Sequence, residues 1–188
     1  MSEWLDIVDE KGNPTGETVE REKAHAEGIL HRTSHVWLMR KHRNAETGEW
    51  VTQVLLQKRS DTKDSFPGCY DISSAGHIPA GCGFEESALR ELEEELGLVL
   101  SREQLISLGD LHKSDRDVFH GKPYHDEQIS RVFYALCDRE ERDFQLQESE
   151  VSGVLWMDLL AVKKRLADRS FPNCIHAEEL SMLPEILP

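Results

Sequence analysis

Residues 76–98 read GHIPAGCGFEESALRELEEELGL and hold the most informative pattern of the sequence. Apolar residues recur at helical spacing between Phe84 and Leu96, and Gly97 follows as a residue suited to a helix end. A helix is therefore predicted over this stretch. At about 100° per residue, three of its leucines fall on one stripe that is expected to face the core: Leu89, Leu92 and Leu96.

Three glutamates, Glu91, Glu94 and Glu95, gather on the roughly opposite face of the same predicted helix. Like charges within one turn repel each other, which a sequence tolerates in open solvent or offsets by binding a hard cation. Carboxylate oxygens are the ligands that Mg²⁺ prefers. Taken alone, the glutamates leave both explanations open, and a solvated acidic face is the commoner one.

The wider segment resembles the Nudix box, G-x5-E-x7-R-E-U-x-E-E-x-G-U, where U is an aliphatic residue. The resemblance implies an α/β (α+β) fold, a Nudix-type α/β/α sandwich with a mixed central sheet. It also implies that water attacks a diphosphate linkage in a small phosphorylated substrate. Eight of the nine specified positions match in register: Gly76, Arg90, Glu91, Leu92, Glu94, Glu95, Gly97 and Leu98.

The resemblance also assigns roles within the box. It implies that Glu94 and Glu95 bind Mg²⁺ or Mn²⁺, and that Glu91 binds the metal or orients the attacking water. Gly76 is included in this metal site, and Arg90 is expected to organise the carboxylates by charge-assisted hydrogen bonds. A cation held there would neutralise phosphate charge and lower the pKa of its bound water.

One position departs from the pattern, because Cys82 stands where the box has its first glutamate. A thiol does not pair with Arg90 as a carboxylate does. In the family this glutamate mainly supports the geometry, so its absence weakens the support more than the metal site. Glu85 or Glu86 could substitute, and a reactive role for the Cys82 thiol is the less favoured alternative.

Motifs outside the box resemble the isopentenyl-diphosphate isomerase-like branch of the family. They read LHR at residues 30–32, HVWL at 35–38 and LLQKR at 55–59, followed by FPG, DIS and GH between residues 66 and 77. In true isomerases of this branch, histidines and glutamates hold a metal. The matching residues here are His31 and His77, with His25 as a looser match and Glu127 near the late glutamate. Whether His25, His31 and His77 form a second metal site stays open.

The reaction expected from these patterns is hydrolysis rather than isomerisation. Isomerases of the branch carry an essential cysteine just before the Gly-His pair, and this chain has Ala75 there. Their glutamate helix is degraded, whereas this one is intact. An isomerase and a catalytically inactive binding module remain the alternatives.

Three further residues are candidates for substrate binding. Lys58 and Arg59 could contact substrate phosphate, although a solvated position at the end of a strand is equally consistent with the pattern. His77 is the third candidate. The pair His31 and His35 has H-x3-H spacing but lacks the glutamate of a zinc helix, so it predicts no zinc site by itself.

The whole sequence is interpreted as one Nudix domain over residues 1–188. It is expected to open with a β-hairpin around the turn at residues 11–16. Two polar stretches, residues 41–48 and 115–125, are read as loops. Asp158 is expected to begin a late helix that runs to about Asp168. Nothing is read from the tail after Phe171. Strands are expected at residues 35–39, 51–58, 70–73, 105–111, 129–137 and 154–157.

Composition restricts the partners. The net charge is −14, which would repel nucleic-acid polymers and anionic membranes but not a phosphate ester bridged by a cation. No run approaches the ~18 apolar residues of a membrane span, and the acidic N-terminus lacks the features of a signal peptide. The four cysteines show no C-x-x-C pairing and are expected to be reduced thiols. A cytoplasmic location is expected, and the oligomeric state is open, with a homodimer as one option.

Overall fold

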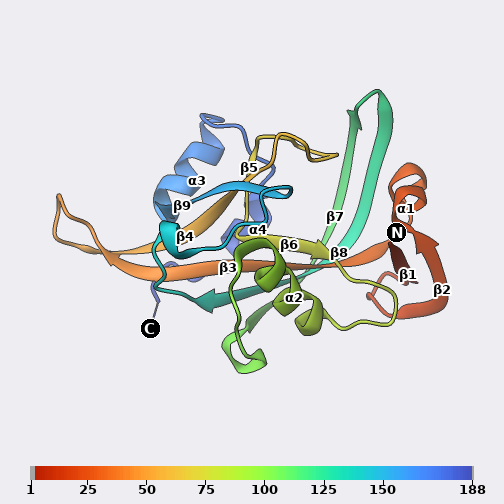
Figure 1. The fold of residues 1–188 in the computed structure, drawn as a ribbon, viewed down its shortest axis with the longest axis horizontal. Coiled ribbons are helices and arrows are strands. Elements are labelled where there is room, and N and C mark those ends of the chain that lie inside the picture. The colour runs from red at the N-terminus through yellow and green to blue at the C-terminus, as the bar shows by residue number, and fades with distance from the viewer. Residues whose placement is uncertain (1–2, 188) are drawn as a thin grey trace.

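A mixed β-sheet forms the centre of the protein, whose computed structural model describes residues 3–187 (Figure 1). Seven strands run in the order β5-β4-β3-β8-β7, with β6 also paired to β3 and β9 to β4. The β3–β8 pair is parallel and the other pairs are antiparallel. The strands are β3 (His31–Arg43), β4 (Trp50–Arg59), β5 (Tyr70–Asp71), β6 (Ser74–His77), β7 (Ile106–Phe119), β8 (Lys122–Leu136) and β9 (Val151–Asp158).

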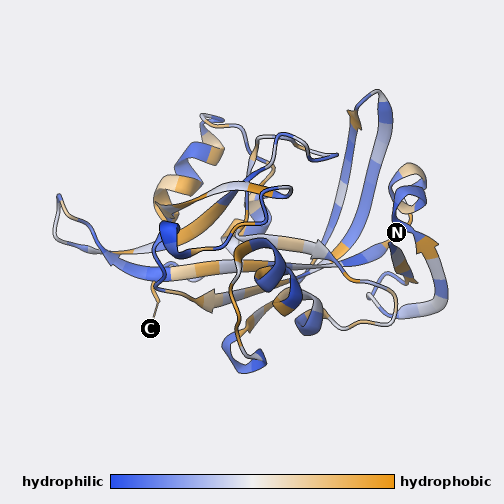
Figure 2. Cartoon of the chain, viewed as in Figure 1, coloured by the Kyte–Doolittle hydropathy of each residue, from blue (hydrophilic) through white to orange (hydrophobic). Residues whose placement is uncertain are grey.

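Strand β3 lies in the middle because its side chains can be buried on both faces. Successive side chains of a strand point to opposite faces. Val36 and Leu38 join a core on one face, whereas Trp37 and Met39 join a second core on the other. All four are fully or almost fully buried. Apolar colouring follows the central parts of β3 and β4, and polar colouring marks the projecting hairpin tips (Figure 2).

The helices complete a three-layer sandwich, which confirms the predicted fold class. Helix α2 (Phe84–Leu96) covers the Val36 face, and α3 (Leu159–Ala167) and the short α4 (Ala177–Ser181) cover the Trp37 face (Figure 1). Helix α2 has the predicted bounds, and Gly97 ends it in the left-handed conformation at φ 62°. Of the expected leucine stripe, Leu92 and Leu96 are fully buried, whereas Leu89 is half-buried beside Ala88.

The predicted N-terminal hairpin is present as β1 (Trp4–Val8) and β2 (Pro14–Glu20), which form a separate two-stranded sheet. Helix α1 (Arg21–Glu27) follows it directly and was not predicted from the sequence. Its seven residues are mostly charged and bury Ala24 alone, so they carry almost no apolar periodicity. Gly28, in the left-handed conformation, ends the helix and turns the chain into β3.

Two predicted loops are shorter than expected because strands extend into them. Residues 115–125 are the tip of a long β7–β8 hairpin that projects beyond the rest of the sheet (Figure 1). Strand β3 likewise runs to Arg43, so the first three residues of the predicted loop at 41–48 belong to the strand and the loop itself begins at residue 44. Cross-strand hydrogen bonding holds these polar segments in the extended conformation although they carry few apolar residues. The polar composition was therefore a poor guide to where the strands end.

The C-terminal part contains a predicted and an unpredicted element. Helix α3 begins after Asp158 as expected and ends at Ala167. The tail after Phe171 then packs α4 against the sheet, with Leu180, Leu183 and Leu187 buried in the core. No helix in residues 3–187 has the length and apolar character needed to cross a membrane.

Candidate functional site: a cavity bordered by the glutamate helix and a histidine cluster

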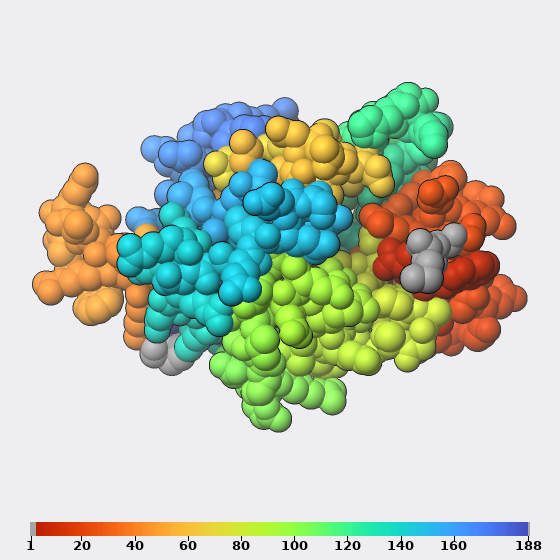
Figure 3. Space-filling model, in the orientation of Figure 1, coloured from red at the N-terminus to blue at the C-terminus, as the bar shows by residue number. Residues whose placement is uncertain are grey.

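One polar cavity gathers most of the residues that the sequence singled out. Its wall is built from α2, the inner strands of the sheet, the β4–β5 loop and the C-terminal segment. On the face seen in Figure 3, the green surface of α2, the gold β4–β5 loop and the red N-terminal segment border this region. Carboxylates, imidazoles and cationic side chains make up most of the lining, so the cavity suits a charged ligand rather than a hydrocarbon.

Gly76 brings strand β6 against the glutamate face of α2. A Cβ atom at Gly76 would lie 2.3 Å from Cδ of Glu91, closer than any real contact. Only glycine therefore lets the strand and this side chain occupy their positions. The first glycine of the box thus lets Glu91 of α2 reach the cavity wall. His77, which follows Gly76 on β6, lines the same wall.

Glu95 is the most buried carboxylate of the glutamate helix, with 3% of its surface exposed. Burial, reinforced by repulsion from Glu91, raises the pKa of Glu95 to about 8. Burial also raises the pKa of Glu91. The Oε2 atom of Glu95 has no hydrogen-bond partner among residues 3–187. An unpartnered buried carboxylate oxygen beside a second carboxylate fits a bound divalent cation, which would replace the missing contact.

Arg90 contacts the other two of the three glutamates. Its guanidinium donates to Oε1 of Glu91 at 2.7 Å, and its Nε lies 3.9 Å from Oε2 of Glu94. Glu94 is largely exposed at the cavity rim, where a solvent-borne ligand reaches it first. The structure therefore brings Arg90 and all three glutamates together.

Neither candidate for replacing the missing box glutamate pairs with Arg90 in the described residues. Glu85 pairs with Arg102 at 3.3 Å, and Glu86 is exposed on the helix. Neither is hydrogen-bonded or ion-paired with Arg90 in the described part of the chain. The half-buried Cys82 side chain packs beside the apolar core under α2. This contact is consistent with an incidental small residue.

The two predicted phosphate-binding cations lie differently. Arg59 lines the cavity and donates to Asp71 Oδ2 at 3.0 Å and to the carbonyl of Ser65 at 2.9 Å. Lys58, its neighbour on β4, is exposed and is not part of the cavity wall. Side chains alternate between faces along a strand, so only one of the pair can face the cavity. Lys63, which the sequence did not single out, also lines it and pairs with Glu150.

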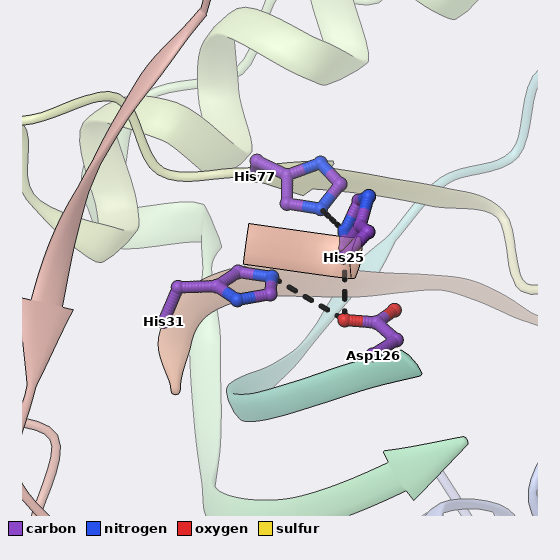
Figure 4. Close-up of side chains that lie close together, drawn as sticks. All are labelled: His25, His31, His77 and Asp126. Atoms are coloured by element: carbon purple, nitrogen blue, oxygen red, sulfur yellow. Dashed lines mark hydrogen bonds and ion pairs between the residues drawn. The ribbon is translucent and has the colours of Figure 1, made fainter. Parts of the chain in front are cut away.

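A histidine cluster occupies a second wall of the same region (Figure 4). His25 comes from α1, His31 from β3, His77 from β6 and Asp126 from β8. The His25 and His77 Nε2 atoms are 3.1 Å apart, and Oδ1 of Asp126 lies 3.3 Å from His31 Nε2 and 3.6 Å from His25 Nε2. The potential ligand atoms all lie within 4.8 Å of one another.

The cluster has the hydrogen-bonding pattern of metal ligands. Nδ1 of His31 faces the carbonyl of Ile29 at 2.8 Å, which leaves Nε2 as the lone-pair atom. His31 Nε2 and Asp126 Oδ1 are buried without a hydrogen-bond partner in the part of the chain described. Burial lowers the pKa of His25 to about 4 and that of His77 well below its ordinary value. Neutral imidazoles are the form that binds metals.

Glu127, expected at the late glutamate position, points elsewhere. Its carboxylate accepts from Ser114 and lies 2.7 Å from Nε2 of His125, outside the cavity wall. Asp126, one residue earlier, faces the histidines instead. A shift of one residue along a strand moves a side chain to the opposite face. Asp126, Gln128 and Ser130 are buried polar residues spaced two apart on β8. This period-two spacing was the signal that would have identified Asp126.

The C-terminal segment supplies a part of the cavity that sequence reasoning missed. Cys174 and His176 line it, and Nε2 of His176 lies 3.0 Å from Oδ2 of Asp115. Behind the wall, the fully buried Glu179 of α4 contacts His35 and Lys113, both of which face the cavity. The sequence held no sign of this, because the partners are far apart along the chain.

Comparison with known proteins decides the family. The family model described as NUDIX domain matches residues 30–175. The chain belongs to the Nudix family. Nudix hydrolases generally cleave diphosphate linkages and typically use divalent metals.

Two relatives show the extent of the similarity. The chain is 37% identical over 159 residues to Nudix hydrolase 3 of Arabidopsis thaliana, covering 82% of this chain but only 19% of that protein. It is 30% identical over 182 residues to the uncharacterized Nudix hydrolase YfcD of Escherichia coli, covering 96% of this chain and 87% of the relative. The second match extends the similarity over nearly the whole chain.

Solved structures share the Nudix fold at lower sequence identity. DR0079 from Deinococcus radiodurans superposes with a TM-score of 0.69 at 21% identity, covering 95% of this chain and 98% of that one. The NUDIX domain of Shewanella oneidensis NrtR, solved with ADP ribose, has a TM-score of 0.55 at 21% identity over 80% of this chain and 84% of its own. These likenesses establish the fold.

Proposed function

We propose that this protein is a divalent-metal-dependent hydrolase that cleaves a diphosphate linkage in a small nucleotide or related phosphorylated compound. The observation that carries the proposal is the buried Glu95, whose Oε2 atom has no partner and which lies beside Glu91 at the wall of a polar cavity. A buried carboxylate without a partner holds a proton, as the raised pKa of Glu95 indicates, unless a cation binds it. Mg²⁺ or Mn²⁺ is the cation that this oxygen-rich set suits.

Under this proposal, the residues around the cavity bind the metal, orient the carboxylates and bind the substrate phosphate. When bound by Glu91, Glu94 and Glu95, the metal would neutralise phosphate charge and acidify a bound water. Arg90 holds Glu91 in one orientation through its 2.7 Å hydrogen bond. Arg59 and Lys63 bring positive charge to the same wall and would bind the phosphate oxygens of the substrate. The alternative role of Glu91, in place of binding the metal, would be to orient the attacking water and take its proton, which a raised pKa suits.

The test is a release assay with the purified full chain. Nucleoside diphosphates and triphosphates, sugar nucleotides and dinucleotides are incubated with Mg²⁺, with Mn²⁺, or with EDTA. We expect metal-dependent release of phosphate or nucleotide from at least one class, and none in EDTA. Absence of release from every class with both metals would contradict hydrolysis and favour the catalytically inactive binding module.

The motifs outside the box resemble the isopentenyl-diphosphate isomerase-like branch, and this resemblance, together with the histidine cluster, supports a proposed second metal position. We infer that His25, His31, His77 and Asp126 bind one divalent transition metal. Atoms bonded tetrahedrally to zinc at about 2.0–2.2 Å lie about 3.3–3.6 Å apart, and three contacts between side chains of the cluster are 3.1, 3.3 and 3.6 Å long. Imidazole ligands suit zinc, copper, iron or nickel, and the carboxylate of Asp126 also suits manganese.

Metal content separates this position from the glutamate site. Elemental analysis of the purified protein is expected to give about one tightly held transition metal, lost in His31→Gln but retained in Glu94→Gln. His112→Ala, which changes an exposed histidine outside the cluster, serves as the control. A metal-free protein that also fails to bind Zn²⁺, Mn²⁺ or Co²⁺ in titrations would contradict the second position.

A further inference from the structure

Glu179 is a buried anion that organises one wall of the cavity from behind. Its side chain is fully buried, and Trp37 Nε1 donates to its Oε1 at 2.9 Å. Its Oε2 lies 2.9 Å from Nδ1 of His35 and 2.6 Å from Nζ of Lys113. Burial opposes ionisation, but His35 and Lys113 outweigh it and hold the pKa of Glu179 below its ordinary range. The carboxylate is therefore charged, and its contacts fix the orientation of both neighbours.

Lys113 is the cationic member of this network on the cavity wall, where His35 also lies. It lines the cavity with 7% of its surface exposed and lies directly opposite Gln128, another lining residue, in the register of β7 and β8. An ammonium group carries three N–H donors, and Glu179 accepts only part of that capacity. The cavity wall on which Lys113 lies also carries His35 and Thr33. This wall therefore presents donors to whatever enters.

A contribution to stability does not by itself account for the ion pair between Glu179 and Lys113. The C-terminal segment is already anchored by Leu180, Leu183 and Leu187, which are buried in the core. A buried ion pair often contributes no more than well-packed apolar side chains of the same size. An ion pair with one member on a cavity wall instead holds a cation at a fixed point. That is what recognition of a polar group requires.

A hydrocarbon group would suit this wall poorly. It would cover Lys113 and Gln128 while leaving their polar atoms without partners, and unpaired polar groups in a site discriminate strongly against such ligands. A group rich in hydroxyl or other oxygen atoms would accept from the ammonium and pair with the amide. The lining would thus favour a diphosphate compound that carries an oxygen-rich group over one that carries a hydrocarbon group.

We propose that Lys113, held by Glu179 as a positioning residue, makes the enzyme selective for diphosphate compounds whose attached group is polar and oxygen-rich, such as a sugar. This rests on the proposed diphosphate chemistry of the same cavity. It adds a specificity determinant supplied by the C-terminal segment. Lys113 is the contacting residue, and Glu179 acts through it.

Binding measurements test the selectivity without requiring turnover. Calorimetry with Ca²⁺ in place of Mg²⁺ compares ADP-ribose with geranyl diphosphate, and we expect ADP-ribose to bind at least about tenfold more tightly. Lys113→Met is expected to remove most of that preference, mainly by weakening ADP-ribose. Lys113→Arg should restore part of it, and Lys163→Met, at an exposed ion pair with Glu185, should leave it unchanged.

Glu179→Gln tests the positioning role. It keeps the shape of the side chain while removing the charge, so we expect a KM for the polar substrate raised about tenfold with kcat changed less than threefold. Circular dichroism identifies any variant that fails to fold, and Lys113→Met/Glu179→Gln removes both charges together. Equal preference in Lys113→Met and the wild type, or wild-type preference for geranyl diphosphate, would overturn the proposal. Retained preference in binding without any hydrolysis would contradict the proposed reaction instead.

Discussion

Glu95 combines two properties at the residue scale, since it is almost fully buried and its pKa is raised to about 8. Between its ordinary pKa of 4.5 and about 8, the folded metal-free protein holds a proton that the unfolded chain has released. Its contribution to stability is therefore present below pH 4.5 and is lost as pH rises through that window. The slope reaches at most about 1.4 kcal/mol per pH unit.

Glu95→Gln is predicted to lower metal-dependent turnover by orders of magnitude, because it removes a ligand charge while conserving shape. In EDTA the same variant should lose less stability than the wild type between pH 5 and pH 8. Activity assays and thermal denaturation at both pH values measure the two effects. Glu94→Gln is the control, because its exposed side chain should affect activity but not the stability difference. Near-full turnover in both variants would show that the helix does not bind the metal.

Cys82 allows a second prediction at this scale. Cys82→Glu restores the family residue and is expected to leave kcat/KM similar or modestly higher, because Arg90 already has carboxylate partners in Glu91 and Glu94. Cys82→Ser should be nearly neutral, and thiol-blocking reagents should have little effect through this position. Steady-state kinetics of both variants measures this. Loss of activity in Cys82→Ser would instead indicate thiol chemistry.

At the scale of elements, the contact between β6 and α2 depends on the missing side chain of Gly76. Gly76→Ala would place a methyl group 2.3 Å from Cδ of Glu91, so the side chain must move or the strand must shift. We expect a loss of about 1–3 kcal/mol in the free energy of unfolding and at least a tenfold fall in kcat. Denaturant titration and kinetics measure these. Gly153→Ala, where an added Cβ meets nothing within 4 Å, should change activity little.

Elements with strong apolar periodicity could be predicted, and those without it could not. Helix α2 and the core of β3 carry a clear pattern, so their type and position followed from the sequence. Helix α1 is mostly charged and α4 has five residues, so both depend on tertiary packing. The same limit explains the site. The glutamate face lies on one predictable helix, whereas Glu179 meets His35 across 144 residues.

At the scale of the whole molecule, the fold joins two potential metal sites at one cavity. The glutamate site comes from a single helix, but the histidine site needs α1, β3, β6 and β8 together. Removing residues 1–27 is therefore predicted to abolish transition-metal binding and to leave the glutamate helix intact. Elemental analysis with circular dichroism of the shortened chain tests this. Full metal content in a folded shortened protein would show that His25 is dispensable.

Whether hydrolysis or isomerisation is possible also depends on which proton-transferring groups the cavity wall carries. Isomerisation of an allylic diphosphate requires one group to protonate a carbon and another to deprotonate a second carbon, and it leaves the diphosphate intact. Ala75, on the cavity wall, offers no proton-transferring group where the isomerases of the branch hold their cysteine. Hydrolysis needs an activated water near phosphorus, which Mg²⁺ held by the glutamate helix would supply under the proposed function.

We therefore predict metal-dependent release of phosphate or nucleotide from at least one diphosphate compound and no solvent deuterium in isopentenyl diphosphate. Nuclear magnetic resonance of isopentenyl diphosphate incubated in D₂O with Mg²⁺ and Mn²⁺ measures the second outcome. Ala75→Cys is the informative variant, because it places a thiol beside His77 without adding the second proton-transferring group that isomerisation needs. It should remain inactive in exchange. Deuterium incorporation at an enzyme-like rate in the wild type would show that another residue of the cavity replaces the thiol, and the hydrolase assignment would then be wrong.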